Sequence, residues 1–193
     1  MTIHSTARSP SPMSADTPHL SVVQKEAHAT LSGVTRYFQK SDSKELFHAL
    51  GPIDLTLHKG EFFSVVGPSG CGKSTLLDTL SGLATPTDGV VLFEGREIKG
   101  VPDGVGVVFQ EDASFPWLNV RDNISFALRM AGMDGAEVQR RVDYAVAFMG
   151  LKDFARAYPA QLSGGMRQRV CIARTLVQQP RLIPVSYTHL RAH

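Results

Sequence analysis

Residues 67–75 combine glycines, a lysine and two hydroxyl side chains at a spacing that can hold a phosphate chain. Their sequence, Gly-Pro-Ser-Gly-Cys-Gly-Lys-Ser-Thr, fits the pattern G-x-x-x-x-G-K-[ST]. The glycines let the backbone curl closely around an anion, and the exposed N–H groups then form an anion-binding nest. Lys73 would reach the β- and γ-phosphates, Ser74 would ligate Mg²⁺, and Thr75 would add a phosphate contact. The candidate phosphate-binding residues are Gly67, Pro68, Ser69, Gly70, Cys71, Gly72, Lys73, Ser74 and Thr75.

The flanks of this loop supply the context that the pattern requires. Residues 61–66 are an apolar run rich in β-branched and aromatic side chains, which predicts a buried strand. Residues 76–80 predict the opening of a helix, whose positive N-terminal end would face the phosphates. The competing interpretation is a glycine-rich turn with a solvated lysine.

A second candidate anion site precedes another predicted helix. Ser163 is a good N-cap, and Gly164 and Gly165 leave their backbone N–H groups uncovered. The helix is expected to run over residues 166–178 and to end before Pro180. A helix N-terminus with a serine hydroxyl can hold an anion, although an ordinary helix cap explains the same residues.

Composition narrows the class of protein. The chain has 193 residues with a net charge of +2 and 20% charged residues, so no strongly basic face suggests nucleic acid. No apolar run approaches membrane-spanning length, and the start of the chain, rich in Ser and Pro, does not resemble a secretory signal. The two cysteines, Cys71 and Cys171, favour a reducing cytoplasm over a disulfide framework.

The order of elements predicts an α/β fold with a helical insertion. Residues 1–29 are expected to be a disordered tail. Helices are expected at 120–130 and 136–149, and the second carries an apolar stripe that is expected to belong to the core. Gly150 and the Tyr158-Pro159 pair then break the helical pattern. The strand candidates other than 61–66 are residues 31–38, 47–57, 90–93 and 105–109.

The loop at 67–75, the sequence Val-Phe-Gln-Glu at 108–111 and the sequence Leu-Ser-Gly-Gly at 162–165 follow one another at a characteristic spacing. Together with Gln-Arg-Val at 168–170, they resemble the ATP-binding subunit of an ABC transporter. This resemblance implies a P-loop NTPase core over 30–183, with an N-terminal antiparallel β-subdomain and an inserted helical subdomain at about 111–178. It also implies ATP and Mg²⁺ as cofactors.

The same resemblance assigns roles to individual residues. Gln110 would lie in the Q-loop, where it touches Mg²⁺ and the attacking water and senses the membrane partner. Ser163, Gly164 and Gly165 would form the signature motif, which serves the ATP bound to the opposite subunit of a head-to-tail dimer. Phe38 would stack on adenine, with Tyr37 as the alternative and a plain core role open for either residue.

Residues 109–118 narrow the resemblance to importer ATPases for nitrate, sulfonate, taurine and related anions. The Phe-Pro-Trp-Leu sequence at 115–118 would help to form the groove for a coupling helix of the permease. Trp117 could equally be a core residue. The implied location is peripheral, at the cytoplasmic face of the membrane beside transmembrane permease subunits.

The sequence departs from the family after residue 183. The family continues into an Asp-Glu pair, the Walker B motif, whereas this chain has no Asp or Glu after Asp153. His189 and His193 do not lie in the context of the family's switch histidine. A back-translation of residues 185–193 matches a transposase-type sequencing adapter, so 184–193 are expected to be a non-native tail on an incomplete domain; a divergent natural terminus is the alternative. A proline-containing tail is not expected to restore the pairing of a central strand.

Three functions therefore compete. The first is an importer ATPase, represented here by a fragment that binds nucleotide but lacks its water-activating carboxylate. The second is a binding-only pseudo-ATPase. The third is a soluble ABC-type ATPase of DNA repair or translation, which the near-neutral charge and the aromatic sequence at 115–117 disfavour.

Overall fold

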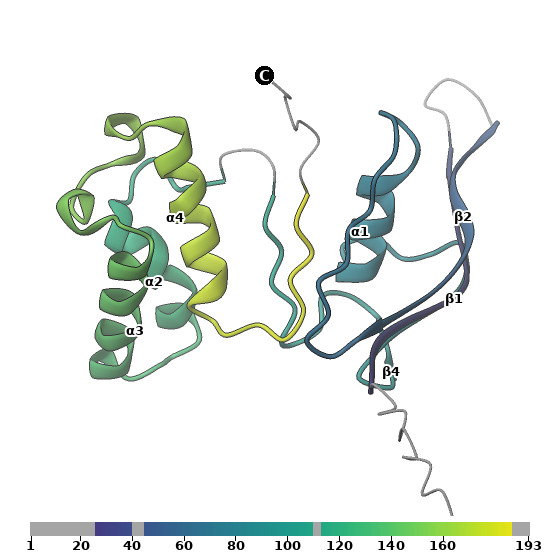
Figure 1. The fold of residues 1–193 in the computed structure, drawn as a ribbon, viewed down its shortest axis with the longest axis horizontal. Helices are drawn as coiled ribbons and strands as arrows, with labels where there is room; N and C mark the ends of the chain where they lie inside the picture. The colour runs from purple at the N-terminus through teal and green to yellow at the C-terminus, as the bar shows by residue number, and fades with distance from the viewer. Residues whose placement is uncertain (1–25, 40–44, 110–112, 187–193) are drawn as a thin grey trace, which may run out of the picture.

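The computed structural model describes residues 26–39, 45–109 and 113–186. Figure 1 shows an antiparallel sheet with one helix packed against it, and a separate group of helices at the other end of the view. Two extended segments run side by side between them. Within these residues, no helix is both long and apolar enough to cross a membrane.

The antiparallel sheet confirms the expected N-terminal β-subdomain and has the strand order β2-β1-β3-β4. Its first strand begins earlier than expected, because His28 and Ala29 are only 7% and 1% exposed and pack in the sheet. The predicted disordered tail at 1–29 is therefore too long, since residues 27–29 belong to a strand; residues 1–25 lie outside the described part. The strands are β1 (Ala27–Gln39), β2 (Leu46–His58), β3 (Asp88–Phe93) and β4 (Arg96–Glu97).

Helix α1 (Lys73–Ser81) covers this sheet through one apolar face. Leu76 and Leu80 of the helix join a buried cluster with Leu31, Val34 and Val91 of the sheet. Fully burying each such side chain contributes about 1.5–3 kcal/mol. This packing fixes the start of α1, and with it the loop at 67–75, relative to the sheet.

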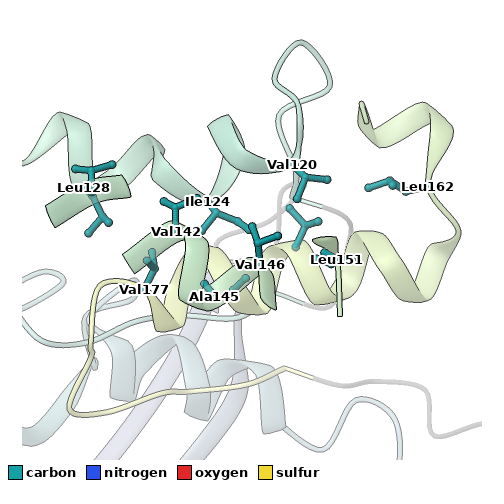
Figure 2. Packing of buried hydrophobic residues seen from close by; sticks show 12 residues of the cluster. Val120, Ile124, Leu128, Val142, Ala145, Val146, Leu151, Leu162 and Val177 are labelled. Atoms are coloured by element: carbon teal, nitrogen blue, oxygen red, sulfur yellow. The ribbon is translucent and has the colours of Figure 1, made fainter. Parts of the chain in front are cut away.

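The inserted helical subdomain is present as expected. It consists of three helices whose N-termini are capped by Asn119, Asp134 and Ser163. The predicted apolar stripe is confirmed, because Val142 and Val146 are each 2% exposed inside the cluster that Figure 2 shows. The bounds are α2 (Val120–Met130), α3 (Gly135–Phe148) and α4 (Gly164–Leu176), with short 3₁₀ turns at Lys152–Phe154 and Pro159–Gln161.

The central segments differ from the expected strand at 105–109. Residues 105–109 do not form a full strand but make parallel bridges, Val105 to Leu182 and Val108 to Val185. The first residues of the tail thus pair with 105–109, whereas among the described residues no bridge links them to residues 61–66. Pro184 lacks an N–H but offers its carbonyl oxygen, which accepts from the Val108 N–H at 3.0 Å, and the Ser186 N–H donates back to Val108 at 3.0 Å.

The predicted buried strand at 61–66 is also wrong for this chain. These residues are extended coil, and Phe62 and Val66 are 94% and 92% exposed. A strand forms only where a neighbour pairs its backbone groups and another layer covers its side chains. Among the described residues no strand lies in register beside 61–66, so its apolar sequence alone cannot bury it.

Candidate nucleotide-binding site

The loop at 67–75 turns sharply into α1. Gly70 and Gly72 have φ angles of 79° and 95°, the left-handed region that the sequence required of its glycines. At Gly72, an added Cβ would also lie 2.5 Å from the carbonyl oxygen of Ala49. Only glycine therefore lets the chain enter the helix at this point.

The Lys73 side chain folds back into the loop. Its Nζ donates to the carbonyl oxygens of Gly67 at 2.9 Å and Pro68 at 2.7 Å, and lies 3.7 Å from the Cys71 Sγ. An ammonium has three donor hydrogens, and a thiol is a weak acceptor. A phosphate oxygen would be a stronger partner than the thiol for the third hydrogen.

The start of α1 adds further donors to the loop. The helix has no side-chain cap and no acidic residue in its first turn. The first N–H groups of any α-helix lack partners within the helix, and they concentrate the positive end of its dipole. The lysine and the helix terminus therefore place positive charge at the same loop, which suits an anion.

Ser74 and Thr75 occupy the first turn of α1. Ser74 is exposed and Thr75 is half-buried, and the Thr75 carbonyl accepts from Thr79 Oγ1 at 2.7 Å. Among the described residues no group of three or more His, Cys, Asp or Glu side chains could hold a metal ion. A Mg²⁺ ion would therefore depend on the Ser74 hydroxyl, nucleotide phosphates and water, which is a usual ligand set for this metal. Gln110, the other expected ligand, lies outside the described residues.

The second candidate anion site has the predicted cap. Ser163 has φ −66° and ψ 160°, and its Oγ accepts from the Met166 N–H at 3.3 Å. Gly164 and Gly165 are exposed in the first turn of α4. Because the Ser163 oxygen serves as the acceptor for its own helix, its O–H remains available to donate to a ligand.

The two candidate anion sites are on different sides of the chain. Helix α1, which begins at Lys73, and helix α4, which begins beside Ser163, lie on opposite sides of the paired central segments (Figure 1). One chain therefore does not bring residues 67–75 and 163–165 together around a single ligand.

The two candidates for adenine stacking differ in exposure. Phe38 is 42% exposed, and the Arg36 guanidinium lies 4.8 Å from its ring centre. Tyr37 is half-buried and packs against the His48 ring with a centroid separation of 4.8 Å. A core role is therefore excluded for Phe38, which is the more accessible of the two rings.

The aromatic sequence at 115–117 forms a small surface cluster. Phe115 stacks on Trp117 at 5.5 Å and contacts Phe126 at 4.7 Å, and the Arg174 guanidinium lies 4.9 Å from the Phe115 ring centre. Trp117 is 70% exposed, which excludes the core role that the sequence left open. The only tryptophan of the chain is held at the surface of the helical subdomain.

Asn123 fixes this cluster, a role that the sequence did not reveal. Its fully buried side chain accepts from the Phe115 N–H at 2.7 Å and donates to the carbonyl oxygens of Phe115, Leu118 and Asn119 at 2.8–3.1 Å. The sequence signal for this buried role was the position of a polar residue on the same helix as the apolar Val120 and Ile124. Such a buried amide is stable only when its hydrogen bonds are satisfied.

A family model for ABC transporters matches residues 50–184 of the chain. The chain is 46% identical over 140 residues to a spermidine/putrescine import ATP-binding protein of Rubrobacter xylanophilus, covering 71% of this chain and 37% of that relative. It is 44% identical over 144 residues to a taurine import ATP-binding protein of Pelagibacter ubique, covering 75% of this chain and 54% of that relative. The chain thus spans about a third to a half of the length of these relatives.

A solved structure shares the fold. It is the dimeric ATP-binding cassette MJ0796 in a post-hydrolysis state bound to ADP and Pi. The TM-score is 0.72 at 33% identity, over 80% of this chain and 72% of that one.

Proposed function

The chain belongs to the ABC transporter family, and from that premise we propose that it is the ATP-binding part of an importer. The observation that carries the proposal is the Lys73 ammonium, held inside a glycine loop at the uncapped start of α1. The intact protein would couple ATP binding and hydrolysis to the uptake of a small solute. The names of two relatives, both import ATP-binding proteins, support this direction of transport.

Each residue of the loop has a distinct role in this proposal. The Lys73 ammonium neutralises the β- and γ-phosphates, while the N–H groups of Gly70, Gly72 and the first turn of α1 bind their oxygens. The Ser74 hydroxyl would help to hold Mg²⁺, which would supply positive charge beside the phosphates. Phe38 stacks on the adenine ring. Gln110 orients the attacking water.

We further propose that two ATPase subunits pair head to tail around two ATP molecules. Ser163 and the glycines that follow it would then contact the γ-phosphate bound to the loop of the opposite subunit. The placement of α1 and α4 on opposite sides of one chain supports this arrangement (Figure 1). The solved relative is described as dimeric, which also supports it.

The partner would be a pair of transmembrane permease subunits, which would keep the protein at the cytoplasmic face of the membrane. The exposed Trp117, stacked on Phe115 and anchored through Asn123, supports a docking role for this cluster. The near-neutral net charge of +2 supports a protein partner over nucleic acid.

For the cargo we propose a small anion of the nitrate, sulfonate and taurine class. The sequence at 109–118 and the taurine-import relative support it, whereas the relative named for spermidine and putrescine supports a polyamine instead. The test is uptake of labelled taurine and labelled putrescine by cells that carry the intact gene or its Lys73→Ala variant. The proposal predicts taurine uptake that the variant abolishes. Putrescine uptake alone would overturn the cargo, and uptake unaffected by the variant would overturn the ATP-driven function.

The 193-residue chain itself is a candidate for nucleotide binding without turnover. It has no Asp or Glu after Asp153 that could polarise the attacking water. We attribute residues 184–193 to an adapter sequence translated in place of the natural continuation. A long sequencing read across the source locus tests this, because an Asp-Glu pair after the codon for Ile183 is expected. A locus that encodes Pro184 to His193 and stops would contradict it and favour a binding-only protein.

A further inference from the structure

The helical subdomain contains a pocket between α2 and α3. Its volume is about 340 Å³, within the size range of sites for small molecules. Three arginines, Arg121, Arg129 and Arg156, line it together with a single carboxylate, Asp122. Part of its wall is apolar and is formed by Val142.

The arginines differ in how they are compensated. Arg121 lies 2.7 Å from Asp143, and this contact holds the pKa of the Asp143 carboxyl below its usual range, so the pair stays ionised. Arg129 lies 3.3 Å from Asp122. Arg156 is exposed and has no hydrogen bond or ion pair among the described residues. The pocket therefore keeps one uncompensated guanidinium.

The backbone N–H groups at the start of α2 are already hydrogen-bonded within the protein. The N–H groups of Val120 and Arg121 at the start of α2 donate to the carbonyl oxygens of Ala157 and Ala155 at 3.0 and 3.1 Å. These bonds hold the segment that carries Arg156 and Tyr158 against α2. The segment thus contributes Arg156 and Tyr158 to the lining of the pocket.

We propose that this pocket binds a small metabolite through a carboxylate or phosphate group. Guanidinium groups bind both kinds of oxyanion with paired, charge-assisted hydrogen bonds. Arg156 supplies the unmatched charge and Tyr158 a further donor, while the apolar wall accommodates the rest of the molecule. Because α2 and α1 lie on opposite sides of the central segments, this site is separate from the loop at 67–75 (Figure 1).

The test is calorimetric titration of the Lys73→Ala chain at low ionic strength with 3-phosphoglycerate, which carries both groups. This background removes phosphate binding at the loop, so the result does not depend on the proposed ATP site. Titrations with acetate and with inorganic phosphate separate the two recognised groups. Arg156→Gln is expected to weaken binding at least tenfold, and Tyr158→Phe to weaken it by a smaller factor.

The matched control is Arg140→Gln, which removes the same charge from the exposed face of α3 outside the pocket. It is expected to leave the affinity within twofold. Circular dichroism checks that the Arg156→Gln variant is folded. We expect it to be folded, because Arg156 is exposed and makes no hydrogen bond or ion pair within the described residues. Absence of 3-phosphoglycerate binding, or equal loss in the Arg140 and Arg156 variants, would overturn the proposal.

Discussion

The Lys73 ammonium donates a hydrogen bond to the Gly67 carbonyl at 2.9 Å across the loop that joins them. With the second bond, to Pro68 at 2.7 Å, the cation is held at the centre of the loop. The Cys71 Sγ lies 3.7 Å from the same ammonium. Nucleotide bound at the loop is therefore expected to change the reactivity of the Cys71 thiol.

Alkylation of Cys71 by iodoacetamide is predicted to slow at least tenfold when Mg-ATP is bound, because the phosphates would cover the thiol. Cys71 is exposed in the free chain, whereas Cys171 is buried and serves as the internal control. Mass spectrometry of the labelled peptides measures both rates. A Cys71 rate that is indifferent to Mg-ATP would place this residue away from the phosphates.

Asn123→Ala is predicted to destabilise the intact protein by roughly 2–4 kcal/mol. The change removes the acceptor of the part-buried Phe115 N–H and the side-chain donor to the Leu118 carbonyl, and each buried group left unsatisfied costs about 1–3 kcal/mol. Denaturant unfolding measures the loss, and Trp117 fluorescence should shift as its loop is released. The control is Gln139→Ala on the exposed face of α3, expected within about 0.5 kcal/mol of wild type. Equal stability of the two variants would contradict the anchoring role of Asn123.

The stability of α3 is predicted to depend on acid through Glu137. Paired hydrogen bonds from Arg140, and then one from Arg141, lower the pKa of Glu137 from 4.5 to about 2. The carboxyl is thus more acidic in the folded than in the unfolded chain. Its stabilising contribution is complete above about pH 4.5 and is lost as the pH falls towards 2.

Titration of the Glu137 carboxyl carbon by NMR measures this directly. Arg140→Gln is expected to raise the Glu137 pKa, because the largest cause of its depression is removed. A Glu137 midpoint near 4.5 in the unsubstituted chain would show that the ion pairs do not persist in solution.

The 193-residue chain is predicted to be poorly soluble and to unfold without a sharp thermal transition. Phe62 and Val66 are almost fully exposed beside the candidate site, and exposed apolar segments of this kind promote association. Scanning calorimetry and light scattering measure both properties. A cooperative, reversible transition of a monomer would contradict this prediction.

The sequence predicted those parts of the fold in which local pattern and tertiary contacts agree. The stripe of Val138, Val142 and Val146 marked the buried face of α3, and Ser163 marked the start of α4. Local pattern failed where a strand depends on distant neighbours. The apolar sequence at 61–66 matches a buried strand, yet no described strand pairs with it.

The candidate site also contains residues that the sequence could predict and residues that it could not. Gly70 and Gly72 could be assigned from the motif, because their backbone geometry is required by the turn itself. The role of Asn123 depends on contacts with Phe115, eight residues away, which no local pattern encodes.

Equilibrium binding of Mg-ATP to the chain tests whether residues 67–75 bind ATP through Lys73. Titrations would compare the unsubstituted chain with Lys73→Ala and with the matched control Lys59→Ala, which removes an exposed lysine outside the loop. We expect saturable binding that Lys59→Ala preserves and Lys73→Ala weakens at least tenfold, about 1.4 kcal/mol or more. Equal affinity of the Lys73→Ala variant and the unsubstituted chain would contradict it.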